Sequence, residues 1–140
     1  MPRYDEVEVG TTIPARVFTV TRANLVRYAG ASGDFNMIHW NERTATAVGL
    51  PNVIAHGMFT MAEAGRLVTD WAGDPTKVES FGVRFSAPVP VPDDDAGTDI
   101  TVSGEVADKL DDGRVRVLLT ATIGEDTKVL SAARAVVRLD

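Results

Sequence analysis

Two kinds of hydrophobic pattern divide the chain, and the helical kind dominates the first half. Its longest example runs from Gly57 to about Ala72. Within it, Glu63, Arg66 and Asp70 share one narrow polar face, and much of the remaining surface is Met, Ala, Gly, Leu and Val. A helix with so little polar surface is expected to be wrapped by apolar groups, such as those of a curved sheet.

Shorter elements precede this helix. A β-prone run at residues 17–20 leads to Thr21, a residue type that caps helix N-termini, and a helix is predicted from Thr21 through Ala29. The small, turn-forming residues 30–34 are predicted to interrupt it. Asn41 is predicted to cap another short helix that ends near Gly49.

After Pro75 the pattern changes to strands. Short apolar or alternating runs, separated by turn-forming residues at 112–113 and 124–126, are expected at residues 77–87, 100–106, 115–123 and 129–139. One buried helix together with an antiparallel sheet predicts the α+β class.

Composition narrows the classes of function. The 140 residues suit one domain, residues 1–140, and the net charge of −6 disfavours nucleic-acid or anionic-lipid partners. The absence of cysteine excludes disulfides and thiolate chemistry. A charged start without an apolar signal core, and no run of about 18 apolar residues, predict a cytoplasmic protein without membrane contact.

Candidate chemistry gathers around the two histidines, His39 and His56. Asp34, Asn36 and His39 fall within six residues, so a turn would bring a carboxylate and an imidazole onto one ligand as an acid/base pair. An Asx-turn, in which Asp34 or Asn36 hydrogen-bonds to the backbone, explains the same spacing. The two histidines are too far apart for a helical metal-binding pair, and no metal is expected.

The second point of interest is the start of the long helix. His56 and Gly57 directly precede its apolar body, where a helix N-terminus presents unpaired N–H groups. A glycine there allows a substrate carbonyl to approach the Gly57 amide, although the same glycine also relieves simple crowding. Met58 and Met61 are expected in the core.

Three stretches carry a family resemblance. Residues 28–39, YAGASGDFNMIH, with Ala45 six residues later, resemble the hydratase-2 motif of the MaoC-like dehydratases, the (R)-specific enoyl hydratases. Residues 54–58, IAHGM, resemble the second signature of that family, and residues 83–92 resemble one of its strand regions. The similarity covers essentially the whole chain and is greatest to the catalytic B subunit of actinobacterial (3R)-hydroxyacyl-ACP dehydratases. Met37 departs from the family pattern, which usually has proline there.

The resemblance implies a hot-dog fold, an antiparallel sheet wrapped around a central helix. It implies reversible dehydration of (3R)-3-hydroxyacyl thioesters to trans-2-enoyl thioesters in fatty-acid metabolism. Asp34 and His39 would form the catalytic pair, Gly57 would donate its N–H to the thioester carbonyl, and Asn36 would help to orient the site. No cofactor is implied, because the pantetheine of coenzyme A or acyl carrier protein is part of the substrate.

Two alternatives stay open at this point. A hot-dog acyl thioesterase would use its carboxylate to activate water at the carbonyl carbon. The second alternative concerns assembly. Because an unpaired sheet edge tends to pair with another chain, the protein is expected to act as a homodimer, or as the catalytic half of an obligate heterodimer with a sister hot-dog subunit.

Overall fold

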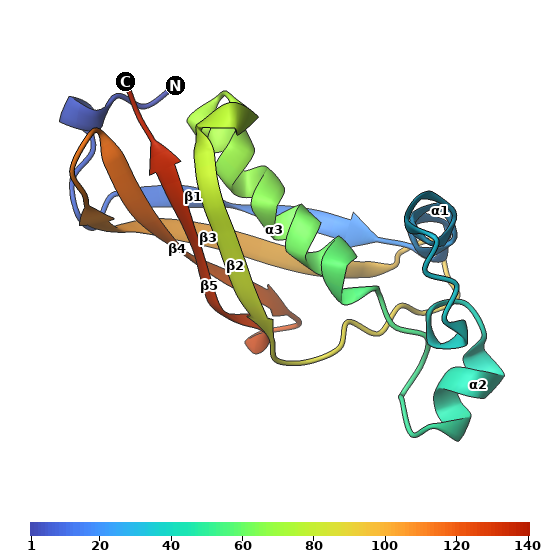
Figure 1. Ribbon diagram of the computed structural model, residues 1–140. Coiled ribbons are helices and arrows are strands. Elements are labelled where there is room, and N and C mark those ends of the chain that lie inside the picture. Colours follow the sequence, from blue (N-terminus) through green and yellow to red (C-terminus); the bar gives the residue numbers. More distant parts are fainter.

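A single curved sheet with a long helix against it organises the molecule (Figure 1). The computed structural model describes all of residues 1–140. The sheet has five antiparallel strands in the order β1-β3-β4-β5-β2. Their bounds are β1 Thr12–Val20, β2 Val78–Phe85, β3 Thr98–Lys109, β4 Arg114–Ile123 and β5 Thr127–Arg138.

Three α-helices and three short 3₁₀-helices complete the chain. The α-helices are α1 Arg22–Ser32, α2 Glu42–Ala47 and α3 Gly57–Ala72. The 3₁₀-helices are η1 Tyr4–Glu6, η2 Met37–His39 and η3 Pro75–Lys77.

Helix α3 is the element around which the sheet curves. Its Ala64, Leu67 and Val68 are buried, and the helix contacts β1 and β2, the two opposite edges of the sheet, as well as β3 and β5. A flat sheet would not bring both edges to one helix. The predicted long helix and the hot-dog architecture are therefore confirmed, and α3 ends where Gly73 adopts a φ of 75°.

The inner face of the sheet supplies the other half of the core. In β4, Val115, Val117, Leu119 and Ala121 alternate toward the helix and are buried, as the period-two pattern predicts. The expectation for Met58 is wrong, because this residue lies in the first turn of α3 and is 57% exposed.

Helix α1 is longer than predicted. It begins after Thr21, whose N–H donates to Asn24 Oδ1 at 2.8 Å, and it continues through Gly30 to Ser32. Gly33, with a φ of 76°, ends it instead, and its N–H donates to the Ala29 carbonyl. Gly30 is tolerated inside the helix because the cost of an interior glycine is only about 1 kcal/mol.

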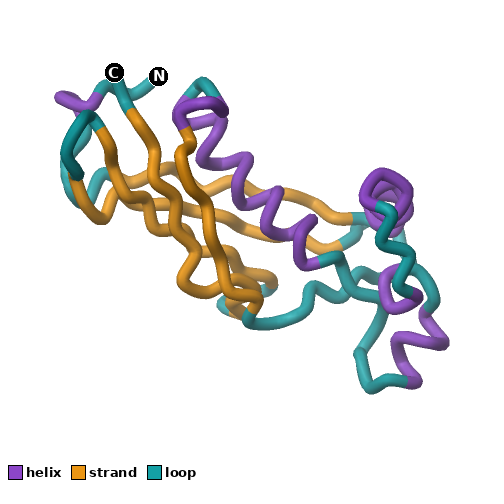
Figure 2. The backbone as a smooth tube through the Cα atoms, viewed as in Figure 1, coloured by secondary structure: helices purple, strands orange, loops and turns teal.

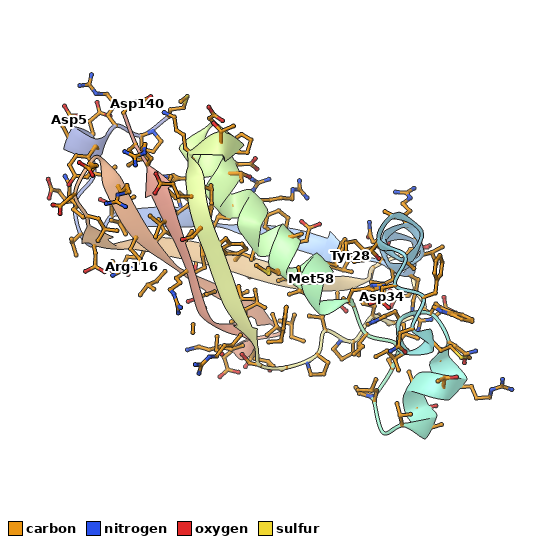
Figure 3. The ribbon with its side chains drawn as sticks, viewed as in Figure 1. Asp5, Tyr28, Asp34, Met58, Arg116 and Asp140 are labelled. Atoms are coloured by element: carbon orange, nitrogen blue, oxygen red, sulfur yellow. The ribbon has the colours of Figure 1, made fainter.

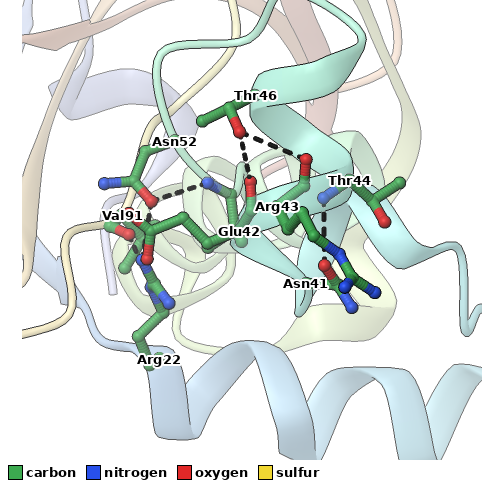
Figure 4. Close-up of polar contacts among 9 residues, drawn as sticks. Arg22, Asn41, Glu42, Arg43, Thr44, Thr46, Asn52 and Val91 are labelled. Carbon is green, nitrogen blue, oxygen red and sulfur yellow. Dashed lines mark hydrogen bonds and ion pairs between the residues drawn. The ribbon is translucent and has the colours of Figure 1, made fainter.

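The segment between α1 and α3 overhangs one end of the sheet, and both chain termini lie at the opposite end (Figure 2). Val91 N–H donates to the Val53 carbonyl at 2.9 Å, which ties the overhang to the loop after β2. Arg22 of α1 strengthens this tie by donating to the Val91 carbonyl at 2.7 Å and to Asn52 Oδ1 at 2.6 Å (Figure 4).

The termini meet at the far end, where Tyr4 N–H donates to the Asp140 carbonyl at 2.9 Å. None of the helices combines the length and the apolar character that a membrane crossing needs.

Candidate active site

Asp34 lies in the turn that follows α1, and its two carboxylate oxygens have different surroundings. Oδ1 accepts the N–H of Asn36 at 3.1 Å, which is the Asx-turn considered from the sequence. Oδ2 faces the ring of His39 instead, and the carboxylate is half-exposed to solvent. The two interpretations of this motif are therefore compatible, because one oxygen holds the turn and leaves the other free.

Asn36 has a similar structural contact. Its Oδ1 accepts the N–H of Ile38 at 3.2 Å and so caps η2, the short helix that carries His39. Asn36 does not line either of the two cavities next to Asp34 and His39. Its observed contact positions the histidine.

His39 is held in one tautomer. Its Nδ1 lies 2.7 Å from the carbonyl oxygen of Ile54, and because a carbonyl only accepts, Nδ1 carries the proton. Nε2 therefore presents a lone pair, 3.8 Å from Asp34 Oδ2. Burial lowers the pKa of His39 below its usual range, and the hydrogen bond to Ile54 and the charge of Asp34 only partly offset this. The imidazole is thus a neutral base near pH 7.

His56 is a buried neighbour of both groups. It is 1% exposed, and its ring stacks on that of His39 with centroids 3.8 Å apart and planes 22° apart. Its Nε2 lies 3.0 Å from the Asp34 carbonyl oxygen, and Nδ1 has no partner. The sequence pointed to this residue as one of the two histidines and as the neighbour of Gly57, but its stacking on His39 was not predictable, since the stacking depends on the tertiary fold.

Asp34, His39 and His56 do not fit a metal ion, although their donor atoms lie within 4.8 Å of one another. A zinc ion sits about 2.1 Å from each imidazole nitrogen and in the plane of each ring. The two rings are stacked, so their planes do not meet within bonding distance of both nitrogens.

Gly57 opens α3 and borders both cavities. Its N–H has no acceptor within the chain, as expected at a helix N-terminus. A cavity of about 280 Å³ adjoins it on the side of His39, and another of about 440 Å³ on the side of Asp34. Phe85 borders both cavities. A Cβ on Gly57 would lie 3.1 Å from the Phe85 ring, so the glycine both relieves crowding and leaves its amide accessible.

The arrangement gathers a neutral base, a carboxylate and a free backbone N–H at the overhanging end of the molecule. Figure 3 shows Asp34, Tyr28 and Met58 together there, far from Asp5 and Asp140. Residues 6–123 match the family model described as the MaoC like domain. The chain belongs to the MaoC-like dehydratase family.

Relatives within this family share both sequence and shape. The chain is 41% identical to the 3-hydroxyacyl-thioester dehydratase X of Mycobacterium tuberculosis over 97 residues, which are 64% of this chain and 34% of that protein. A solved MaoC-like dehydratase superimposes on 99% of the chain with a TM-score of 0.95 and 38% identity, over 42% of its own length. The R-hydratase PhaJ1 from Pseudomonas aeruginosa superimposes on 99% of the chain, and on 86% of itself, with a TM-score of 0.84 and 25% identity. The chain thus spans about a third of dehydratase X and less than half of the first structure.

Proposed function

We propose that this MaoC-like chain catalyses the reversible dehydration of (3R)-3-hydroxyacyl thioesters to trans-2-enoyl thioesters. The observation that carries the proposal is the free lone pair of His39 Nε2, which faces Asp34 Oδ2 at 3.8 Å beside the unpaired N–H of Gly57. The names of dehydratase X and of the R-hydratase PhaJ1 support the same chemistry.

The gap between the two side chains suits an oxygen of the substrate. At 3.8 Å, Nε2 and Oδ2 are too far apart to hydrogen-bond directly. A water oxygen about 2.8 Å from each would bridge them by donating one O–H to each, and the C3 hydroxyl of the substrate would occupy the same position by donating its single O–H to one of the two. Dehydration and hydration would therefore use the same position in opposite directions.

The proton transfers balance within this pair. In dehydration, His39 Nε2 takes the proton from C2, and the C3 hydroxyl leaves as water with a proton supplied by the Asp34–His39 pair. The proton that leaves with the hydroxyl is the one taken from C2, so the pair returns to its initial protonation and one water is released for each enoyl thioester. In hydration, the pair holds the attacking water.

The Gly57 amide would stabilise the charge that develops when C2 loses its proton. That proton is only weakly acidic, and the negative charge moves onto the thioester oxygen. The N–H of Gly57 is a preorganised donor for this oxygen. Because these groups supply both proton transfer and charge stabilisation, we propose that the reaction needs no cofactor and that coenzyme A or acyl carrier protein enters only as part of the substrate.

We further propose that the chain pairs with a second hot-dog unit, either another copy or a sister subunit. The outer edge of β2 has no strand beside it, and Phe85 at its end is 55% exposed next to the site. An open sheet edge with an exposed aromatic residue is stabilised by a partner. Light scattering would test this pairing, and the mass of one chain would contradict it.

Hydration of crotonyl-CoA by the purified chain tests the function directly. Loss of enoyl-thioester absorbance is expected for the wild type and for Asp95→Asn, a control that makes the same change in an exposed loop. Asp34→Asn is expected to be inactive, and equal activity in that variant would contradict the assignment. Release of free thiol would identify a thioesterase instead.

A further inference from the structure

His56 is in contact with every part of the proposed site. Its ring stacks on His39, its Nε2 reaches the backbone of Asp34, and it directly precedes Gly57 at the start of α3. Tyr28 of α1 also packs against it, with ring centroids 4.8 Å apart. The proposed mechanism gives this buried side chain no proton to carry, so its burial and contacts need another explanation.

The contacts of His56 determine where its proton lies. The Asp34 carbonyl accepts a hydrogen bond from Nε2, so Nε2 is protonated and Nδ1 bears a lone pair. Nδ1 is buried and has no partner. A second proton there would be buried without an acceptor, which is costly. The two histidines consequently carry their protons on different nitrogens, Nδ1 in His39 and Nε2 in His56.

We infer that His56 is a positioning residue. As a neutral imidazole, it fixes the positions of Asp34 and His39 relative to the Gly57 amide, and it keeps His39 a free base. The inference rests on the proposed function and deepens it. The Nε2–H fixes the backbone of the carboxylate, and the flat face of the ring fixes the plane of His39 and excludes water from it. One side chain thereby sets the relative positions of the base, the carboxylate and the amide donor.

Few other titratable groups lie close enough to His39 to affect its pKa. The titratable groups that face it are Asp34 from the turn after α1 and His56 from the start of α3, with Tyr28 beyond His56. The charge of Asp34 favours the protonated form of His39, whereas burial beneath the neighbouring ring disfavours it. Removal of the His56 ring is therefore expected to raise the pKa of His39 toward its ordinary value of about 6.5.

The first test determines which ring nitrogen of each histidine is protonated, and it needs no substrate. Because the chain has only two histidines, ¹⁵N-histidine labelling gives two sets of ring-nitrogen signals, which His39→Ala assigns. At pH 7.5, the wild type is expected to show a protonated Nδ1 in His39 and a protonated Nε2 in His56. A protonated Nδ1 in His56 would overturn the inference, even if no variant of His56 can be purified.

The second test separates the two contacts of His56. His56→Gln retains a side-chain donor for the Asp34 carbonyl but removes the ring, and His56→Phe retains a ring but removes the donor. Both are expected to lower kcat by about 10- to 100-fold with little change in KM, the scale of a small misplacement of reacting groups. The His39 titration midpoint should rise in His56→Gln and stay near the wild-type value in His56→Phe.

A matched control distinguishes positioning from general loss of stability. Val117→Ala removes a buried side chain from β4, away from the site, and should lower Tm while leaving kcat and the His39 midpoint unchanged. Folded His56→Gln with a wild-type midpoint and wild-type kcat would overturn the inference. An inactive wild type with the expected histidine protons would instead contradict the proposed function alone.

Discussion

His39 Nε2 and Asp34 Oδ2 face each other across 3.8 Å, and neither atom is used by the hydrogen bonds that hold its own residue in place. The histidine is held through Nδ1 and the aspartate through Oδ1. Each side chain thus has one atom that holds the structure and one that is free for the proposed chemistry, so the pair is fixed in place without losing its free lone pairs.

Replacing the base should separate activity from folding. His39→Ala removes the Nε2 lone pair and is expected to reduce turnover by at least about 10²-fold, the scale of general base catalysis. The circular dichroism spectrum should be unchanged, because the turn before η2 is held by Asp34 and Asn36. Activity near that of the wild type would exclude His39 as the base.

The pH dependence of kcat/KM should follow the neutral form of His39. Because burial holds the pKa of His39 below about 6.5, the decline of activity toward acid pH should have its half-maximal point below about pH 6.5. A half-maximal point above about pH 6.5 in initial-rate measurements would show that burial does not lower the pKa of the histidine in this way.

The same pKa shift should affect stability. A depressed pKa in the folded state means that the unfolded chain binds the proton first as the pH falls. The contribution of neutral His39 to the free energy of unfolding is therefore present above about pH 6.5 and is lost as the pH falls through its lower folded-state pKa. Urea unfolding at pH 7.5 and 5.5 should show a smaller difference in His39→Ala than in the wild type.

Access to the Gly57 amide should depend on Phe85. Gly57→Ala suits the helix, since Gly57 has no positive φ, but its methyl group meets the Phe85 ring at 3.1 Å. We expect kcat/KM to fall between about 10- and 10³-fold, the upper limit being the loss of one oxyanion donor, with no loss of Tm. Gly57→Ala combined with Phe85→Leu should recover part of the activity. Strictly additive losses in this double-mutant cycle would refute the steric explanation.

Arg22 should stabilise the overhanging segment. Arg22→Leu removes the side-chain donor to the Val91 carbonyl and one of the two donors to Asn52 Oδ1, which is expected to lower the free energy of unfolding by about 1–3 kcal/mol. Arg27→Leu, on the exposed surface of the same helix and without an ion pair, should change it by less than about 0.5 kcal/mol. Equal unfolding midpoints in urea for the two variants would contradict a structural role for Arg22.

The sequence predicted those features that depend on local chemistry. The long helix α3 was predictable because its polar face is narrow and uninterrupted from Glu63 to Asp70, and Gly73 follows its end. The pairing of Asp34 with His39 was predictable because a six-residue turn keeps them together. Both depend on residues that are close in the chain.

The features that the sequence did not predict depend on contacts between distant segments. Met58 is an apolar residue in an apolar helix, yet it is 57% exposed in the first turn of α3. The alternating run at residues 77–87 predicts a strand but not that β2 is an edge strand, or that the 55% exposed Phe85 borders two cavities. The stacking of His56 on His39 needs α3 and the overhang to meet, and no local pattern specifies that contact.

The hydrogen bond between Tyr4 and Asp140 makes the backbone almost a closed ring. A short linker between the first and last residues would therefore join them with little strain, and circular permutation becomes practicable, with new ends opened in an exposed turn such as residues 124–126. The same geometry means that an affinity tag, a fluorophore or a fused partner attached at either terminus would emerge at the end of the molecule farthest from the Asp34 carboxylate (Figure 3). Such attachments can report on the protein or immobilise it without obstructing the cavities beside Asp34 and His39.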